Sequence, residues 1–243
     1  MINLDVDDLQ LYIGDDYVIN DNIKILQPTI KEIAIFGERN FFSVVHTLTA
    51  IPSDMKSQLW DMGLDWVELK DYELFMMLAP TLPMEKTSLL LGDIDLTKLK
   101  TFKMKENDNI VLADPETGII IDEMIYIRIV NYLRKVFNLT PKVEKPANKA
   151  TKKILIDEDR QKILLNKDKE FKSYLLPMIS ALKVKQGYTK EYVLNMGYVE
   201  FMNDIARLRI IDNAEHLMNG IYAGTIDTKK INKNELNWMK EIN

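Results

Sequence analysis

The residue types that most often carry catalysis or bind metals are sparse in this 243-residue chain. It contains no cysteine, which excludes disulfide bonds, thiolate nucleophiles and cysteine-ligated zinc. Its two histidines, His46 and His216, are far apart in the sequence, whereas a helical metalloprotease motif places two histidines four positions apart. We therefore expect each histidine on an ordinary helix surface or in a satisfied core site, and not in a metal pair.

Acidic residues are the next candidates for chemistry. Asp5, Asp7 and Asp8 offer the oxygen ligands that calcium and magnesium prefer. A calcium-binding EF-hand loop counted from Asp5 would need a glycine at its sixth position and a glutamate at its twelfth, and neither is present. The cluster is therefore interpreted as a solvated acidic terminus.

A second acidic pair, Asp93 and Asp95, flanks an isoleucine, and we interpret this alternation as a strand. Pairs of carboxylates that act as in glycosidases are brought together only by folding, and the chain has 37 acidic residues. The sequence therefore leaves a carboxylate site open as an alternative without selecting a pair.

Nucleotide and nucleic-acid binding are disfavoured. The nine glycines form neither a G-x-G-x-x-G nor a G-x-x-x-x-G-K-[ST] phosphate loop. Lysines cluster between residues 142 and 153, but the aromatic residues that usually alternate with basic ones in single-strand binding sites are missing there. With a net charge of −5, we expect a solvated linker and no nucleic-acid partner.

Trp60 and Trp66 lie on either side of Gly63. Tryptophan is enriched among the anchors of protein interfaces, although core packing is its more common role. Both roles stay open, with the core favoured. From the sequence we assign no catalytic, cofactor-binding or metal-binding residue, and we expect a protein that is not an enzyme and needs no cofactor.

The composition fits a soluble globular chain. Hydrophobic residues make up 47% and charged residues 28% of the sequence, and a chain of this length buries about 70–75% of the surface that its unfolded form exposes. The acidic N-terminus does not resemble a secretory signal, and no apolar run approaches the ~20 residues of a membrane span. The absence of cysteine suits a reducing compartment, so an intracellular protein without a membrane partner is expected.

The N-terminal half is expected to mix short strands with helices. Apolar clusters separated by Gly, Asn and Asp predict strands at residues 9–13, 17–19 and 23–26. Pro28 then marks the change to helices. These are expected around residues 30–34 and 40–48, from an N-cap at Ser53 to Gly63, and from an N-cap at Asp71 to the break at Pro80 and Pro83.

Residues 99–121 return to strand character. Strands at 101–105, 110–113 and 119–121, separated by turns at 107–109 and 114–118, predict an antiparallel meander. Residues 122–138 then carry an apolar stripe at helical spacing, with acidic residues at the start and basic residues at the end, which favours a helix.

Residues 139–153 contain two prolines and five lysines and predict an exposed linker. Helices are expected at 154–166, at 171–186 with a late start or kink at Pro177, at 198–219 before a stop at Gly220, and at 233–240. The predicted fold is α+β and predominantly helical. We expect an α+β domain at 1–138, the linker at 139–153 and a helical domain at 154–243.

Several segments, in this order, resemble a group of phage proteins. They are Ile-Leu-Gln-Pro-Thr-Ile-Lys-Glu-Ile at 25–33, Ala-Ile-Pro-Ser-Asp-Met-Lys at 50–56, Asp-Pro-Glu-Thr-Gly at 114–118, Gly-Ile-Tyr-Ala-Gly-Thr-Ile-Asp at 220–227 and Asn-Trp at 237–238. The chain resembles proteins of the tail-morphogenesis region of tailed phages and prophages of Gram-positive bacteria, and is most similar to tail assembly chaperones.

This resemblance implies a factor in the host cytoplasm that binds the phage tape-measure protein, or another tail protein, before the tail tube polymerises around it. It implies no catalytic residue. A homo-oligomer is also compatible with it. The alternatives are a structural component of the virion, such as a tail-completion, connector or baseplate protein, and an enzyme with an unrecognised carboxylate site.

Overall fold

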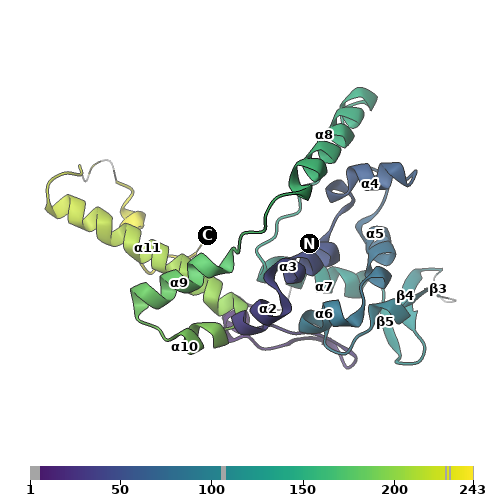
Figure 1. Ribbon diagram of the computed structural model, residues 1–243, viewed down its shortest axis with the longest axis horizontal. Helices are drawn as coiled ribbons and strands as arrows, with labels where there is room; N and C mark the ends of the chain where they lie inside the picture. The colour runs from purple at the N-terminus through teal and green to yellow at the C-terminus, as the bar shows by residue number, and fades with distance from the viewer. Residues whose placement is uncertain (1–5, 105–107, 228, 230, 243) are drawn as a thin grey trace.

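The computed structural model describes residues 6–104, 108–227, 229 and 231–242. It confirms the predicted class, because helices dominate and two small antiparallel sheets, of two and three strands, lie among them. Figure 1 shows a central body from which two long helices, α8 and α11, project in different directions.

The first element is a helix, α1 (Asp8–Ile13), and the strand expected at residues 9–13 is wrong. The carboxylate of Asp7 accepts a hydrogen bond of 2.7 Å from the backbone N–H of Gln10, which is an N-cap. Gly14 ends the helix with a φ of 85°. The two flanking signals outweigh the apolar run between them, because a helix of one and a half turns depends on its ends.

The next two predicted strands form a hairpin. β1 (Tyr17–Asn20) pairs in antiparallel fashion with β2 (Ile23–Ile25). After Pro28, Thr29 and Glu32 form a capping box, in which each side chain accepts a hydrogen bond from the backbone N–H of the other residue, at the start of α2 (Ile30–Phe36).

A run of short helices follows and builds one side of the body. They are α3 (Glu38–Thr49), η1 (Pro52–Asp54), α4 (Lys56–Asp61), α5 (Asp71–Leu78), η2 (Ala79–Thr81), α6 (Met84–Leu91) and η3 (Leu96–Lys98). The helix expected from Ser53 is divided into a 3-10 turn and α4. Asp71 is the first residue of α5 and not its cap, which is Lys70.

The strand expected around Asp93 and Asp95 is wrong as well. Residues 92–95 form a turn between α6 and η3, and the Asp95 carboxylate accepts hydrogen bonds from the backbone N–H and the hydroxyl of Thr97. An Asp two positions before a Thr is a local capping signal, and here it prevails over alternation.

The meander is confirmed. β3 (Lys100–Lys103), β4 (Ile110–Asp114) and β5 (Ile119–Ile121) form one antiparallel sheet in that order. Asp114 holds the 114–118 turn by accepting hydrogen bonds from the Glu116 N–H and the Thr117 hydroxyl, and Gly118 adopts a φ of 73°. Residues 105–107, which include one end of the expected strand 101–105 and the start of the expected turn 107–109, lie outside the described residues.

The helix expected at 122–138 is α7 (Glu123–Val136), and Asp122 caps it through the Ile125 N–H. The Tyr132 ring stacks on the Tyr17 ring with centroids 4.4 Å apart, which joins α7 to the first hairpin. The buried residues of α7 are Tyr126, Ile129, Val130, Tyr132, Leu133 and Val136.

The C-terminal half consists of α8 (Lys149–Lys167), α9 (Leu175–Gln186), α10 (Lys190–Asn195), α11 (Tyr198–Tyr222) and the 3-10 helix η5 (Lys233–Leu236). Residues 149–153, expected in the linker, are the first turns of α8, which Asn148 caps through Thr151. Pro177 lies in the first turn of α9, so the late start is the correct alternative. The helix expected at 233–240 is reduced to η5.

One hydrophobic core runs through both halves. It contains Ile30 and Leu133 from the first half together with Tyr198 and Phe201 from the second. A second, smaller cluster joins Ile156 of α8 to Leu59, Trp66 and Leu74 around α4 and α5. Whether 1–138, 139–153 and 154–243 are separate folding units stays a prediction. Among the described residues, no helix is both long enough and apolar enough to cross a membrane.

Candidate protein-binding groove

The residues first considered for chemistry do not converge. His46 and His216 are exposed on α3 and α11 respectively. Asp7 caps α1, and Asp8 forms an ion pair of 2.9 Å with Lys135, while Asp5 lies outside the described residues. Within the described part of the chain, no three His, Asp or Glu side chains are grouped as metal ligands.

Two of the five lysines at 142–153 form ion pairs within the protein. Lys142 pairs with Glu144 at 3.0 Å, and Lys152 pairs with Asp65. The Lys152 ammonium also lies 5.1 Å from the ring centroid of Trp66 and 5.6 Å from that of Trp60. These aromatic neighbours, Trp60 in α4 and Trp66 in the loop after it, are some 90 positions away in the sequence, so the local pattern of the lysine cluster did not reveal them.

The two tryptophans differ in exposure, which separates the core role from the interface role that the sequence left open for both. Trp66 is only 2% exposed and belongs to the small cluster beneath α8, whereas Trp60 is 48% exposed. The interface-anchor interpretation therefore remains only for Trp60.

Glu144 connects the segment before α8 to the N-terminal end of α4. It accepts a hydrogen bond of 2.9 Å from the buried Lys56, and its backbone N–H donates to the Ser53 hydroxyl. The hydrogen bonds from Lys56 and Lys142 lower the pKa of the Glu144 carboxyl to about 2, against the partial desolvation that opposes them. The arrangement is an internal anchor, because each charge has its partner within the protein.

A shallow cleft between α5 and α7 contains the carboxyl groups of Asp71 and Glu123. It has a volume of about 320 Å³ and brings Asp71 near Tyr126 and Arg134. Desolvation by the surrounding protein raises the pKa of Asp71, an effect that Arg134 opposes and Asp54 reinforces. Burial likewise raises the pKa of Tyr126. Arg134 donates 3.0 Å to the carbonyl oxygen of Thr49, so the cleft contains a guanidinium that has a structural role.

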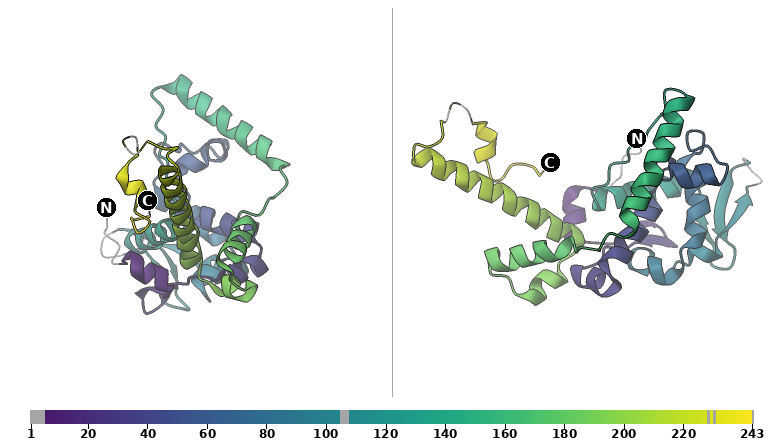
Figure 2. Two further views of the ribbon diagram at one scale, coloured as in Figure 1. Left: turned by 90° about the vertical axis from the view of Figure 1, so that its left-hand side faces the viewer. Right: turned by 45° about the horizontal axis from the view of Figure 1, so that its top comes forward.

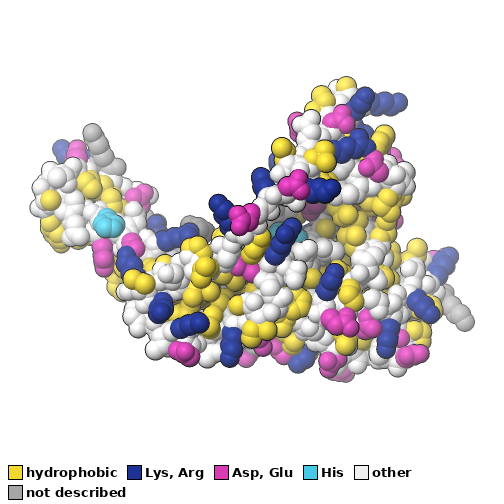
Figure 3. Space-filling model, viewed as in Figure 1, with side chains coloured by type: hydrophobic (Ala, Val, Ile, Leu, Met, Phe, Trp, Pro, Cys, Tyr) yellow, Lys and Arg dark blue, Asp and Glu magenta, His cyan; other side chains and the backbone are white. Residues whose placement is uncertain are grey.

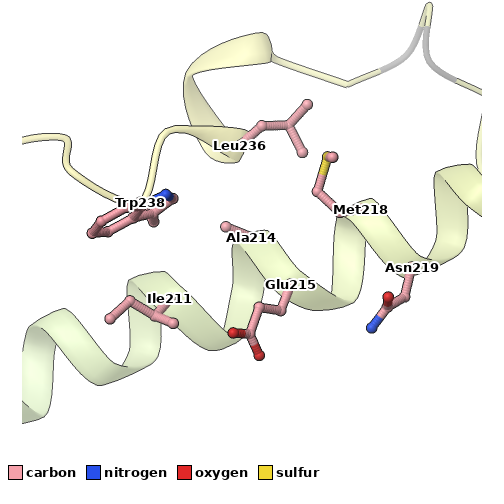
Figure 4. A pocket seen from close by; sticks show the side chains of 7 residues that line it. All are labelled: Ile211, Ala214, Glu215, Met218, Asn219, Leu236 and Trp238. Carbon is pink, nitrogen blue, oxygen red and sulfur yellow. The ribbon is translucent and has the colours of Figure 1, made fainter.

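The larger cavity, about 650 Å³, is an apolar groove at the far end of α11. One wall is α11, and the other is the chain that returns along it through η5. Figure 4 shows Met218, Leu236 and Trp238 beside the space between the two walls, whereas Glu215 and Asn219 point away from the returning chain. The seven lining residues are Ile211, Ala214, Glu215, Met218, Asn219, Leu236 and Trp238.

Arg207 fixes the returning chain against α11. Its guanidinium donates hydrogen bonds of 2.8 Å to the carbonyl oxygens of both Trp238 and Lys240. Arg207 lies one helical turn before Ile211, the first groove residue. Its two hydrogen bonds therefore hold the segment that carries Trp238 against α11 at that end of the groove. The wall of the groove that carries Trp238 is thereby attached to α11 by hydrogen bonds.

A turn after α11 begins the return of the chain. The sequence predicted a helix stop at Gly220, but α11 continues to Tyr222, and Gly224, with a φ of 68°, follows it in the left-handed conformation. Gly220 instead makes room, because a Cβ atom there would lie 2.4 Å from Cδ1 of Ile226. The backbone N–H groups of Thr225 and Ile226 both donate to the Gly220 carbonyl.

Further apolar side chains are exposed on the second half of α11 and on the returning chain through η5, which together are called the α11 arm. Tyr222, Trp238 and Met239 are each more than half exposed. In Figure 3 hydrophobic side chains appear at the surface of the α11 arm, together with a mixture of acidic and basic ones. An apolar groove with aromatic and methionine walls and a polar rim has the composition of a protein-binding surface.

The comparison with protein families finds one match on this part of the chain. Residues 166–243 match the family described as the YomV second domain, and YomV is a Bacillus prophage protein. The matched region includes α9, α10, α11 and the groove. This links the C-terminal part of the chain to phage-derived proteins. Comparison with curated proteins and with solved structures gives no match.

Proposed function

We propose that this protein is a phage tail assembly protein that acts by binding and without catalysis. In this proposal it is a chaperone for the tape-measure protein, and the groove between α11 and the returning chain holds an apolar helical segment of that partner. The observation that carries the proposal is the groove itself, which is apolar, open to solvent and bounded by a chain that Arg207 holds against α11.

The size of the groove suits side chains from a helix. A volume of about 650 Å³ accommodates a few large apolar side chains and is too small for a whole helix. An amphipathic helix presents such anchors at positions i, i+3 or i+4, and i+7 along one face. A long helical tape-measure protein repeats faces of this kind along its length, and they are exposed until the tube forms.

The mode of binding also suits a temporary partner. A chaperone for an assembling tail has to leave when tube subunits arrive, so each copy should bind with modest affinity. Occupation of many sites along one long partner compensates for weak single contacts. The exposed Tyr222 and Met239 beside the groove add contact area that a partner of changing sequence can use, since methionine and tyrosine adapt to different surfaces.

The test is capture of the partner in solution. The protein is co-expressed with a tape-measure protein from the same genome, and soluble complex is measured by affinity purification. Met218→Asp, which places a charge in the groove, should abolish capture. Ile35→Asp is the matched control, because Ile35 is fully on the surface of α2, far from the groove in the sequence, and should leave capture unchanged.

Two outcomes would contradict the proposal. Equal capture by both variants would remove the groove from the mechanism. Detection of the protein in purified virions by mass spectrometry, in a constant number of copies per particle, would show a structural component that stays in the tail in place of a chaperone that leaves.

A further inference from the structure

The surface of α4 already binds a helix, and that helix is α8 of the same chain. Ser57 lies in the first turn of α4, where backbone N–H groups have no partner within the helix. The Asp159 carboxylate on α8 accepts from both the Ser57 N–H, at 2.9 Å, and the Ser57 hydroxyl, at 2.6 Å. α4 therefore has its N-terminal cap supplied from a distant helix.

Charged and apolar contacts complete this surface. Arg160 of α8 pairs with Asp61, and Lys152 pairs with Asp65 next to the ring of Trp66. Between them Ile156 is buried in the small cluster with Leu59 and Trp66. The receiving side thus offers acidic and aromatic side chains and the Ser57 donors, and the bound side offers two cations, an isoleucine and the Asp159 carboxylate.

The four contact residues of α8 define the face that this surface accepts. Lys152, Ile156, Asp159 and Arg160 follow one another at spacings of four, three and one, which places them along one side of a helix. A helix that binds this surface needs a cation and, one turn later, an apolar residue. One further turn on, it needs a carboxylate followed directly by a second cation. It can be met by any helix that carries the same face.

α8 lies outside the main core. Residues 145–148 before it and 168–172 after it have no regular secondary structure. Its buried contacts belong to the small cluster and not to the main core. Toward its end, Leu164 and Leu165 are 67% and 71% exposed, so much of the helix projects into solvent (Figures 1 and 2).

We propose that α4 and the loop to Trp66 form a second helix-binding site, for an amphipathic helix of a partner protein, and that α8 occupies this site in the free protein. Two features favour a partner helix: the charge complementarity of Asp61 and Asp65 with cations two turns apart, and the position of the present occupant outside the main core. This site is separate from the α11 groove, and it stands or falls independently of the tape-measure assignment.

Competition with α8 determines how strongly a partner helix binds. A segment tethered by short flexible linkers acts at an effective concentration on the order of millimolar. A helix added from outside therefore binds weakly to the wild-type protein and much more tightly when α8 is loosened. This difference is the signature of an occupied site, since a site with no internal occupant would show no such dependence.

The experiment uses a fluorescent synthetic peptide with the sequence of residues 148–167 and the full-length protein. The variant Ile156→Ala with Asp159→Ala weakens α8 while leaving Leu59, Trp66 and both aspartates of the site in place. Fluorescence anisotropy should show binding to this variant at least about tenfold tighter than to the wild type. Adding Asp61→Lys and Asp65→Lys to the same variant should remove the binding, because the cations of the peptide then meet like charges.

The proposal is overturned if the loosened variant, folded by circular dichroism, does not bind the peptide. It is equally overturned if binding survives the two charge reversals. If the loosened variant forms a dimer by light scattering in which α8 of one copy cross-links to α4 of the other, the occupant is a second copy, and the assignment to a partner protein is wrong.

Hydrogen exchange on the wild-type protein gives a second measurement that needs no variant. Amides of α8 should exchange at least about tenfold faster than those of α7, and an excess of peptide should accelerate α8 further by displacing it. Exchange of α8 only at the rate of the main core, unaffected by peptide, would show a permanent structural contact and would overturn the proposal.

Discussion

Two joints connect the C-terminal helices to the rest of the molecule, and they are built differently. The joint at the end of α10 and the start of α11 is made by backbone and core. The Ile30 N–H donates 3.0 Å to the Met196 carbonyl, the Tyr198 N–H donates 3.1 Å to the Pro28 carbonyl, and Phe201 is fully buried behind them. Removing this joint would expose both apolar surface and unpaired backbone groups.

The joint at α8 is made chiefly by side chains. Two ion pairs and the Asp159–Ser57 hydrogen bonds surround a single fully buried isoleucine, Ile156. Exposed ion pairs contribute about 0–1 kcal/mol each, whereas a buried aromatic side chain contributes several. The comparison shows that position along the chain does not decide whether a helix belongs to the main core. The helices α9, α10 and α11 contribute to that core, whereas α8, which precedes them, packs only on the small cluster.

The largest expected effect tests the first joint. Phe201→Ala should lower the free energy of unfolding by about 3–5 kcal/mol, because it opens a cavity where both halves meet. Leu176→Ala on the exposed side of α9 should change it by less than about 0.5 kcal/mol. Urea unfolding followed by circular dichroism measures both. Two separate transitions in the wild type would break the comparison, since a shared core should unfold as one unit.

The second joint should respond to Ile156→Ala by loosening locally. We expect a loss of about 2 kcal/mol in the free energy that holds α8 closed, at the low end for Ile→Ala because the cluster is small. Ile154→Ala is the control on the same helix, since Ile154 is 57% exposed and Ile156 only 3%. Hydrogen exchange of α8 reports the effect. An equal destabilisation of α7 would mean that α8 is as integral as α11.

The Glu144 anchor lies just before α8 and belongs to the second joint. Its contribution to the free energy of unfolding should depend on pH. Its carboxyl has a pKa of about 2 in the folded protein against 4.5 ordinarily, so the anchor contributes fully above about pH 4.5, and the contribution is lost as the pH falls toward 2. Glu144→Gln should cost about 1–2 kcal/mol at neutral pH and flatten the stability curve in that window. Glu158→Gln, at an exposed position of α8, should leave the slope unchanged.

The smallest expected effect concerns the wall of the α11 groove. Gly220→Ala places a Cβ against Ile226, whose side-chain end can move, so the global free energy of unfolding should fall by less than about 1 kcal/mol. The returning chain should nevertheless shift, which NMR chemical shifts of the Trp238 indole report. Gly197→Ala, where a Cβ atom would meet nothing within 4 Å, is the matched control. Unchanged Trp238 signals would show that the turn does not set the groove.

Local signals in the sequence predicted much of the fold. The capping box at Thr29, the Asp122 cap of α7 and the Asp-Pro-Glu-Thr-Gly turn each specify their own geometry within four or five residues. The strand expected at 9–13 failed because its apolar residues were weighed above Asp7 and Gly14. The helix over 149–153 was missed because its lysines were interpreted as solvated.

The candidate sites were beyond the reach of such signals. The groove depends on Trp238 returning to Ala214 and Met218, and the α4 site depends on Asp159 meeting Ser57 across 102 positions of the chain. Nothing local in either partner specifies the other. Arg207, which holds the returning chain, had no distinguishing pattern in the sequence, because its two acceptors are backbone carbonyls.

Glu38 has a consequence for work with fragments. Its carboxylate accepts hydrogen bonds from the Ser173 hydroxyl and from the N–H groups of Tyr174 and Leu175, and so supplies the N-terminal cap of α9 from the start of α3. A polypeptide cut to residues 166–243, the region that matches the prophage family, would lack this acceptor and expose the apolar side of α11. Expression trials of that region should therefore include residues 28–49 in the same polypeptide or supply them as a second chain.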